Sequence, residues 1–323
     1  MSHRVVVSDN KVSDVEIMTT VLEDAGHMVD IVREDSTDEL IDVLDGAAGV
    51  IPDARTPITR ELIETNSSLR VIGRGGVGVD NVELETAAAN DVIVVNVPDY
   101  GVDEVSAHAF TLALSCLRKI RTFDIAIRAG NWDWTVGKPI PRLRGSTVGL
   151  VAFGKIARRH AKKWQGFGVD VIAYDPYVAN YRMKDLGVEK VEFEDLLQRS
   201  DIVSIHAPLT DETEGMFGKA EFAEMKDSAV LVNTARGPII SEAALADALE
   251  AGGLEAAGID VFEEEPSADS ILLDSEDVVA TPHVAWHSTE SLEELSRKVA
   301  EDVVRVLDGE EPRSSVTAES PWV

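Results

Sequence analysis

A phosphate-binding turn is the clearest chemical pattern in this sequence. Residues 152–157, Ala-Phe-Gly-Lys-Ile-Ala, follow an apolar run and open a stretch of helix formers. They match the pattern G-x-G-x-x-G at the middle glycine, and alanine at the last position is an accepted variant. Alanine at the first position is tolerable if the turn stays at negative φ. We expect the N–H groups of Gly154, Lys155 and Ile156 at the helix start to bind pyrophosphate.

A carboxylate follows where a dinucleotide site needs one. Asp175 closes a second apolar strand, 175 − 152 = 23 positions after the start of the turn. Strand, turn, helix and strand in this order form a dinucleotide-binding unit, in which the carboxylate binds ribose hydroxyls and repels a 2′-phosphate. NAD is therefore the expected cofactor, while the pattern leaves tolerance of NADP open. A glycine turn alone also serves packing in many α/β proteins, and the spacing to Asp175 strengthens the functional interpretation.

Other groups with ionic or acid–base chemistry follow later apolar runs. An arginine lies in NTARG (233–237), three glutamates lie in DVFEEEP (260–266), and two histidines lie in TPHVAWH (281–287). Ligands of a doubly wound sheet bind past the carboxyl ends of its strands, so we expect these groups on one rim. In the first half, RGGVGVDN (74–81) offers bare backbone N–H groups. Two such rims facing each other would form an interdomain cleft, where small-molecule sites are common.

The elements that must position these groups alternate along the chain, which predicts an α/β fold with two doubly wound, Rossmann-like domains. Apolar runs typical of strands are 4–8, 28–32, 49–51, 71–73, 92–97, 148–153, 171–174, 202–205, 229–232, 257–261 and 278–280. Stretches typical of helices are 13–25, 37–44, 59–65, 103–128, 155–165 and 288–307.

Length and composition favour two cores and a reducing compartment. The 323 residues, 44% of them hydrophobic, are enough for two domains. No apolar run has membrane-spanning length, and the N-terminus enters a strand without a signal peptide, so we expect a cytoplasmic protein without a membrane partner. The single cysteine, Cys116, lies in an apolar stretch and is expected to be a buried small hydrophobe rather than a nucleophile.

The net charge is strongly negative. Asp and Glu number 59 against 30 Lys and Arg, which gives a formal charge of −29. Nucleic acid is excluded as a partner, because phosphate binding needs the opposite sign. Self-repulsion of this size weakens a compact state in dilute buffer. We therefore expect the protein to work in concentrated salt, as in a halophile's cytoplasm, where screening is short-ranged.

The sequence resembles the D-2-hydroxyacid dehydrogenases, most closely the branch of the C-terminal binding proteins and phosphoglycerate dehydrogenases. The matching segments cover most of the chain in family order: GRGGVGVDN, NVPDYGVDEVSAH, LRGSTVGLVAFGKIA, YDPY, HAPLT, NTARG, DVFEEEP and TPHVAWHS. The resemblance implies NAD(H)-dependent, reversible reduction of a 2-oxo acid to a D-2-hydroxy acid. It implies a flavodoxin-like substrate domain of residues 1–100 and 288–323, and a dinucleotide-binding domain of residues 101–287. The sequence stops soon after Leu307, so no extra regulatory domain is expected.

The resemblance also implies catalytic roles. His283 would be the general acid that protonates the carbonyl oxygen, and Glu265 would orient it and favour its protonated form. Arg236 would bind the substrate carboxylate. Each also has a structural interpretation: a buried histidine, a solvated glutamate beside Glu263 and Glu264, or a capping arginine. The motif context favours the catalytic interpretation.

Further site residues follow from the same resemblance. Trp286 would line the substrate pocket, and the backbone of Val77 and Gly78, with Arg74, would bind the substrate carboxylate. A packing tryptophan and a plain glycine turn are the alternatives. Asp260 would take the nicotinamide carboxamide, although acids at strand ends are also common packing partners. The other expected cofactor contacts are Gly154, Lys155, Ile156, Asp175, Pro176, His206, Ala207, Pro208, Thr213, Thr234, Ala235 and Ala285.

Other functions stay open. An NAD(H)-sensing scaffold that binds protein partners would use the same cofactor residues, but the intact arginine, glutamate and histidine favour an enzyme. A short-type phosphoglycerate or glyoxylate reductase would share the chemistry and differ in substrate. No metal is expected, because no carboxylate motif accompanies His283 and His287. A homodimer is the family habit, with segments 103–128 and 131–141 as candidates for its contact surface.

Overall fold

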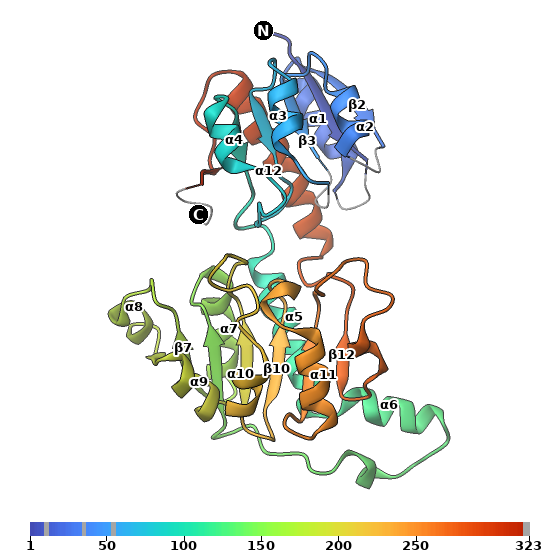
Figure 1. Ribbon diagram of the computed structural model, residues 1–323, viewed down its shortest axis with the longest axis vertical. Helices are drawn as coiled ribbons and strands as arrows, with labels where there is room; N and C mark the ends of the chain where they lie inside the picture. Colours follow the sequence, from blue (N-terminus) through green and yellow to red (C-terminus); the bar gives the residue numbers. More distant parts are fainter. Residues whose placement is uncertain (10–12, 34–36, 53–55, 319–323) are drawn as a thin grey trace. The chain divides into compact units, whose positions relative to one another are not determined.

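The chain forms two compact α/β units. The computed structural model describes residues 1–9, 13–33, 37–52 and 56–318. One unit comprises Met1–Gly101 and His287–Val323, and the other comprises Val102–Trp286 (Figure 1). Each unit is built on its own sheet of mainly parallel strands with helices on its faces, so the expected fold class is confirmed. The interdomain cleft stays a prediction.

The first unit has a six-stranded sheet in the order β13-β5-β4-β3-β1-β2. All neighbouring strands are parallel except β13, which runs antiparallel to β5. Its strands are β1 (Arg4–Ser8), β2 (Met28–Val32), β3 (Gly49–Ile51), β4 (Val71–Gly73), β5 (Ile93–Val95) and β13 (Ser315–Val316). Its helices are α1 (Val15–Asp24), α2 (Thr37–Val43), α3 (Arg60–Thr65), α4 (Leu84–Ala89) and α12 (Thr289–Leu307).

Helix α12 completes this unit although it comes from the far end of the sequence. It packs against α1 and against strands β3, β4 and β5. The approach to β4 is close, because a Cβ added to Gly73 would lie 2.7 Å from a methyl group of Val303. Ser288 caps the helix by accepting a hydrogen bond of 2.9 Å from the Ser291 N–H. The first unit is therefore assembled from both ends of the chain.

The second unit has a seven-stranded parallel sheet in the order β12-β11-β10-β9-β6-β7-β8. Its strands are β6 (Thr147–Val151), β7 (Asp170–Tyr174), β8 (Glu189–Lys190), β9 (Ile202–Ile205), β10 (Val230–Asn233), β11 (Ala256–Ile259) and β12 (Val278–Ala280). Its helices are α5 (Val102–Leu117), α6 (Ile120–Arg128), α7 (Lys155–Gln165), α8 (Asn180–Lys184), α9 (Phe193–Arg199), α10 (Lys219–Glu224) and α11 (Glu242–Glu250). The chain winds from β6 in both directions, so the strand order reverses between β6 and β9, where doubly wound sheets bind ligands.

Two hydrophobic cores cover the two faces of this sheet. One contains side chains of α9, α10 and α11 around the buried Phe217. The other contains side chains of α5 and α7, including the fully buried Trp164 and the buried Cys116. Burial raises the pKa of the Cys116 thiol to about 12, which agrees with a hydrophobe rather than a nucleophile. Along the described chain, no helix combines the length and apolar character needed to span a membrane.

The helical segment expected at 103–128 is two helices, so that prediction was wrong in its continuity. Helix α5 ends at Leu117 and α6 begins at Ile120. Between them, Lys119 adopts a left-handed conformation with φ of 53°. Its ammonium lies 2.5 Å from Glu255 Oε1, which holds the reversal against the start of β11. The continuous helical pattern gave no sign of this break, because lysine is a good helix former.

Candidate active site

The turn after β6, residues 152–156, is called the glycine turn below. Helix α7 begins at Lys155 and ends at Gln165, as expected from the sequence, with Gly154 before its first residue. The condition under which alanine was judged tolerable at position 152, a negative φ, is not met, because its φ is 70°. The Ala152 N–H donates to the Tyr174 carbonyl at 2.8 Å. The tertiary contact to β7 thus holds alanine in a conformation that normally favours glycine.

Asp175 fastens the glycine turn. Its Oδ2 accepts the N–H of Phe153 at 2.8 Å. Its Oδ1 accepts the N–H groups of Tyr177 at 2.8 Å and Val178 at 3.1 Å, which folds the chain that follows Pro176. The carboxylate expected to bind ribose therefore also shapes the backbone on both sides of it.

Other expected cofactor residues follow β9 and β10. The imidazole of His206 lies 3.0 Å from Ser204 Oγ, and burial lowers the pKa of His206 well below its usual value. The Thr213 hydroxyl donates to the Pro208 carbonyl at 2.6 Å and closes the turn that follows Ala207. Thr234 follows β10 directly and is 8% exposed.

Two observations show that these residues suit a dinucleotide. A Cβ added to Gly154 would meet nothing within 4 Å, so the start of α7 has open space in front of it. The Thr234 hydroxyl is one of the few buried side-chain polar atoms of the described residues without a hydrogen-bond partner. A buried polar atom without a partner is costly unless a ligand satisfies it. Open space at the start of α7 and a buried hydroxyl without a partner at Thr234 both suit a bound NAD.

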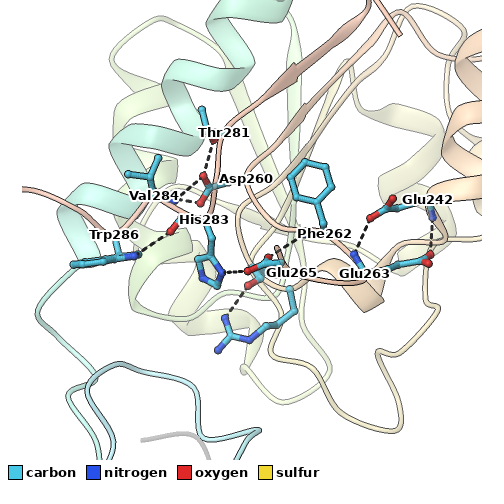
Figure 2. Close-up of polar contacts among 12 residues, drawn as sticks. Glu242, Asp260, Phe262, Glu263, Glu265, Thr281, His283, Val284 and Trp286 are labelled. Atoms are coloured by element: carbon cyan, nitrogen blue, oxygen red, sulfur yellow. Dashed lines mark hydrogen bonds and ion pairs between the residues drawn. The ribbon is translucent and has the colours of Figure 1, made fainter. Parts of the chain in front are cut away.

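His283 and Glu265 form the central acid–base pair of the second unit. Nδ1 of His283 lies 2.6 Å from Glu265 Oε2, and Figure 2 shows the imidazole pointing at this carboxylate. The side chain of His283 is 43% exposed and that of Glu265 is 28% exposed. Glu265 Oε1 accepts the Phe262 N–H at 3.1 Å, which fixes the carboxylate. Because Nδ1 faces Glu265, Nε2 is the ring nitrogen available to a ligand.

Electrostatics keep Glu265 ionised. Burial by itself would raise the pKa of Glu265. The hydrogen bond and charge of His283, the Phe262 N–H and the charge of Arg236 outweigh it, so the pKa lies below its usual value. An ionised carboxylate cannot donate, so Nδ1 of His283 carries the hydrogen of this contact and the ring is held in one orientation. The pair is therefore suited to general acid catalysis.

Asp260 fastens the segment 281–286, which is called the histidine turn below. The Asp260 carbonyl accepts the His283 N–H at 2.7 Å. Its carboxylate accepts the N–H group of Val284 at 2.9 Å and the Thr281 hydroxyl at 2.5 Å (Figure 2). It also accepts the N–H group of Ala285 at 2.9 Å. Asp260 is fully buried, and His283 has a left-handed φ of 52°. The residue expected to take the nicotinamide carboxamide thus holds three successive backbone amides around His283.

Trp286 gives the histidine turn a further contact. Its indole N–H donates to the His283 carbonyl at 3.1 Å (Figure 2). The sequence predicts Trp286 as part of a pocket wall or as a packing residue. It does not predict this hydrogen bond, because a contact between residues i and i+3 outside a helix leaves no pattern in the sequence.

Arg236 lies in a turn folded by Asn233. The buried Asn233 side chain accepts the Ala235 N–H at 3.0 Å and donates to the Arg236 carbonyl at 2.8 Å. A Cβ added to Gly237 would lie 1.7 Å from the Phe262 carbonyl oxygen, so this turn abuts the segment of Glu265. The two strand ends that carry the arginine and the glutamate are thereby fixed to each other. Sequence reasoning missed Asn233, although asparagine at the end of a strand is a known turn-former.

Two further glutamates connect α11 with the segment of Glu265. Glu263 Oε1 accepts the Glu242 N–H, and Glu242 Oε1 accepts the Glu263 N–H, both at 2.7 Å (Figure 2). Glu263 is exposed, and through these two hydrogen bonds it supports the turn that ends in Glu265. Among the described residues, no group of His, Cys, Asp and Glu side chains is arranged to hold a metal ion.

The rim of the first unit uses mainly backbone groups. The Val77 carbonyl accepts the Asn96 amide at 2.7 Å, and the Val77 side chain is exposed. The Arg74 guanidinium donates to the Gly75 carbonyl at 2.7 Å. Gly76 has a φ of 150°, and a Cβ there would lie 1.5 Å from Arg74 Nη1. Glycine at 76 is therefore required for the guanidinium to fold beneath the loop that leads to Gly78.

Comparisons with known proteins agree with this geometry. Residues 110–285 match the NAD binding domain of the D-isomer specific 2-hydroxyacid dehydrogenases. The D-3-phosphoglycerate dehydrogenase of Archaeoglobus fulgidus is 37% identical over 286 residues, which are 88% of this chain and 54% of that protein. That of Bacillus subtilis is 35% identical over 308 residues, 95% of this chain and 57% of that protein. The chain spans about half the length of the curated relatives it matches.

Solved structures are similar to this chain over nearly its whole length. The TT0316 protein of Thermus thermophilus has 30% identity and a TM-score of 0.88, with 97% of this chain and 100% of that chain covered. D-lactate dehydrogenase of Aquifex aeolicus, solved with NAD and lactic acid, has 25% identity and a TM-score of 0.86, with 94% and 96% covered. The chain belongs to the family of D-isomer specific 2-hydroxyacid dehydrogenases, and its second unit contains the family's NAD-binding domain.

Proposed function

We propose that this protein catalyses the reversible, NAD(H)-dependent reduction of a 2-oxo acid to a D-2-hydroxy acid. The observation that carries the proposal is the His283–Glu265 pair, with its 2.6 Å contact at Nδ1 and an exposed imidazole edge. A general acid beside an ionised carboxylate suits a reaction that protonates a carbonyl oxygen. The D configuration of the product rests on family membership.

When bound, NADH would supply a hydride for the carbonyl carbon of the substrate. Nε2 of His283 gives its proton to the carbonyl oxygen, so the oxo group becomes a hydroxyl group. Glu265 accepts the Nδ1–H throughout, which fixes the tautomer and stabilises the cation before transfer. Arg236 binds the substrate carboxylate and polarises the oxo group. Solvent then reprotonates His283, whose side chain is 43% exposed.

The glycine turn and the ends of the neighbouring strands would hold the cofactor. Gly154, Lys155 and Ile156 bind the diphosphate at the start of α7, and Asp175 binds the ribose. Thr234, with its buried hydroxyl, belongs to the same set. The contributions of Arg74, Val77 and Gly78 to the substrate site stay a prediction.

The names of the relatives suggest several 2-oxo acids as the substrate. Curated relatives carry the name D-3-phosphoglycerate dehydrogenase, which favours a phosphorylated three-carbon acid as one candidate. Another solved relative, 26% identical with a TM-score of 0.88, is a glyoxylate reductase. A screen must therefore contain pyruvate, glyoxylate, a bulkier 2-oxo acid and the 2-oxo form of 3-phosphoglycerate, each with NADH and NADPH. Steady oxidation of the cofactor separates an enzyme from the alternative, an NAD(H)-sensing scaffold.

Association into a homodimer and a cytoplasmic location are also expected. Every residue of α6 is at least partly exposed, and Ile120, Ile125 and Ile127 are among its more exposed side chains. Trp132 and Trp134 in the following loop are more exposed still. Apolar groups in such number favour a contact surface. Sedimentation in dilute buffer and in molar KCl tests the dimer and, with unfolding curves, the expected salt requirement.

The decisive test is His283→Asn, assayed with this screen in molar KCl. We expect kcat to fall at least about 100-fold, because asparagine cannot deliver a proton, while NADH still binds. His287→Asn is the matched control, a histidine four positions later, and should keep its activity. Wild-type turnover in His283→Asn would refute the proton-donor assignment.

A further inference from the structure

His108, a residue of helix α5, contacts the support of the histidine turn. Its Nε2 lies 3.0 Å from Thr281 Oγ1 and 3.7 Å from Asp260 Oδ1. The side chain of His108 is 24% exposed, whereas that of Asp260 is 1% exposed. Helix α5 packs on β10, β11 and β12, so His108 stands on a rigid element beside the strands that carry the site.

The direction of the hydrogen bonds can be worked out from Thr281. Its hydroxyl has one hydrogen, which it donates to Asp260 Oδ1 at 2.5 Å. The Thr281 oxygen therefore accepts at its other side, and His108 Nε2 must carry the hydrogen. The result is a directed chain of hydrogen bonds from the His108 N–H through the Thr281 O–H to the Asp260 carboxylate. Each bond in such a chain polarises the next one.

Asp260, the last acceptor in this series of hydrogen bonds, holds the backbone around His283. The Asp260 carboxylate binds the N–H groups of Val284 and Ala285, and its carbonyl binds that of His283. These contacts keep His283 at a left-handed φ of 52°, which a non-glycine residue adopts only under constraint. A donor that fixes the Asp260 carboxylate therefore also fixes the direction of the imidazole.

We infer that His108 is a positioning residue, which acts through Thr281 and Asp260 to hold the histidine turn in its reactive geometry. The inference rests on the proposed function for its kinetic consequence. Its structural consequence, tight backbone hydrogen bonds in segment 281–287, does not depend on that function. His108 touches neither His283 nor Glu265 in these contacts, so its effect on the reaction is indirect.

Two variants of His108 separate the hydrogen bond from packing. His108→Phe keeps a ring and removes the donor, whereas His108→Gln keeps an N–H near the place of Nε2. We expect His108→Phe to lower kcat about tenfold with KM for the 2-oxo acid changed less than about twofold, because small misplacements mainly affect the reacting geometry. His108→Gln should recover most of the wild-type rate. Amide exchange in peptide 281–287 should be faster in His108→Phe and near wild type in His108→Gln.

Thr281→Val tests whether the effect passes through the hydroxyl. If it does, His108→Phe combined with Thr281→Val is no slower than Thr281→Val alone. Additive losses in that double variant would overturn the inference, as would wild-type kcat and exchange in His108→Phe. Should His108→Phe fail to fold, loss of both rate and protection in the folded His108→Gln would contradict the inference. A wild type inactive on every 2-oxo acid would refute the proposed function, while the exchange comparison would still decide the role of His108.

Discussion

Two turns of the second unit each hold a non-glycine residue in a left-handed conformation, and they do so in different ways. The glycine turn and the histidine turn each contain a non-glycine residue with positive φ, Ala152 at 70° and His283 at 52°. In each, an aspartate directly after the neighbouring strand accepts hydrogen bonds from backbone N–H groups of the turn. This aspartate is Asp175 for the glycine turn and Asp260 for the histidine turn. The sheet thus repeats the same device at β6–β7 and at β12–β11.

The difference lies in how the carboxylates are used. Asp175 gives one oxygen to the glycine turn and the other to its own following turn. Asp260 gives both oxygens to the histidine turn, and the Thr281 hydroxyl adds a third hydrogen bond. A turn that binds a cofactor through backbone N–H groups tolerates small adjustments. If His283 is the proton donor, as we propose, its turn must hold the imidazole more closely, and this would account for the denser support around it.

Asp260→Asn should disrupt the histidine turn, the more densely hydrogen-bonded of the two turns. An amide places an N–H group against the N–H of Ala285 or Val284 in a fully buried site. We expect kcat/KM to fall about 100-fold or more. The free energy of unfolding should fall by about 3 kcal/mol, because a buried donor loses its partner. Steady-state kinetics and urea unfolding measure the two effects, and a rate within about threefold of wild type would contradict the assigned support, because misplacement of a reacting group costs far more than that.

The helix that follows the glycine turn can be tested by measuring the free energy of unfolding against pH, because α7 contains the fully buried His160. The indole N–H of Trp164 donates to its Nε2 at 2.8 Å, so Nδ1 carries the hydrogen toward the Ser106 carbonyl. Burial lowers the pKa of His160 from 6.5 to about 4. Below pH 6.5 the unfolded state binds the proton more readily than the folded state, so stability falls as the pH decreases toward 4.

This single group should contribute a loss of about 3 kcal/mol between pH 6.5 and 4. His160→Gln cannot titrate, so the difference between wild-type and variant unfolding free energies should shrink over that window. Urea unfolding at half-unit pH steps provides the curves. Parallel curves for the two proteins would show that His160 is not the titrating group.

Asp175→Asn should have a smaller and different effect. The substitution removes one acceptor and the charge near the ribose site, so we expect the Kd for NADH to rise about tenfold, or about 1.4 kcal/mol. At saturating NADH, kcat should stay close to wild type, because the histidine turn is untouched. Titration of cofactor fluorescence gives Kd. A drop in kcat as large as that of Asp260→Asn would erase the distinction between the two turns.

Ala152→Gly should have the smallest effect and the opposite sign. Glycine adopts a φ of 70° without strain but loses more backbone entropy on folding, so the free energy of unfolding should rise by about 0.5 kcal/mol. Ala161→Gly in the interior of α7, where φ is helical, is the matched control and should lower it by about 1 kcal/mol. Equal signs for the two variants would mean that Ala152 is not strained.

Much of the fold could be read from periodicity. The bounds of β2 and β12 follow from apolar runs, and those of α7 follow from a run of helix formers that Gly166 ends, because local spacing decides those elements. The break at Lys119 could not be read, because an ion pair with the distant Glu255 imposes it on a helical pattern. The positive φ of Ala152 was missed for a similar reason, since the constraint comes from Tyr174 and Asp175 on the next strand.

The candidate site shows the same division. Arg236, Glu265 and His283 were predictable as strand-end residues, because parallel strands of one sheet end on one side. Their supports were not: Asn233, Glu242 and His108 act through hydrogen bonds whose partners lie elsewhere in the sequence or on its backbone. Sequence patterns predict which reactive groups lie at a strand end. They do not predict the hydrogen bonds that hold those groups in place.

The return of α12 and β13 to the first unit has a consequence for biosynthesis. The N-terminal 101 residues leave the ribosome long before the helix that covers β3, β4 and β5 has been translated. Until then, a sheet edge at β5 and an apolar face remain open, and both are prone to wrong pairing. The sheet of the first unit can therefore be completed only after translation has passed Val316, the last residue of β13.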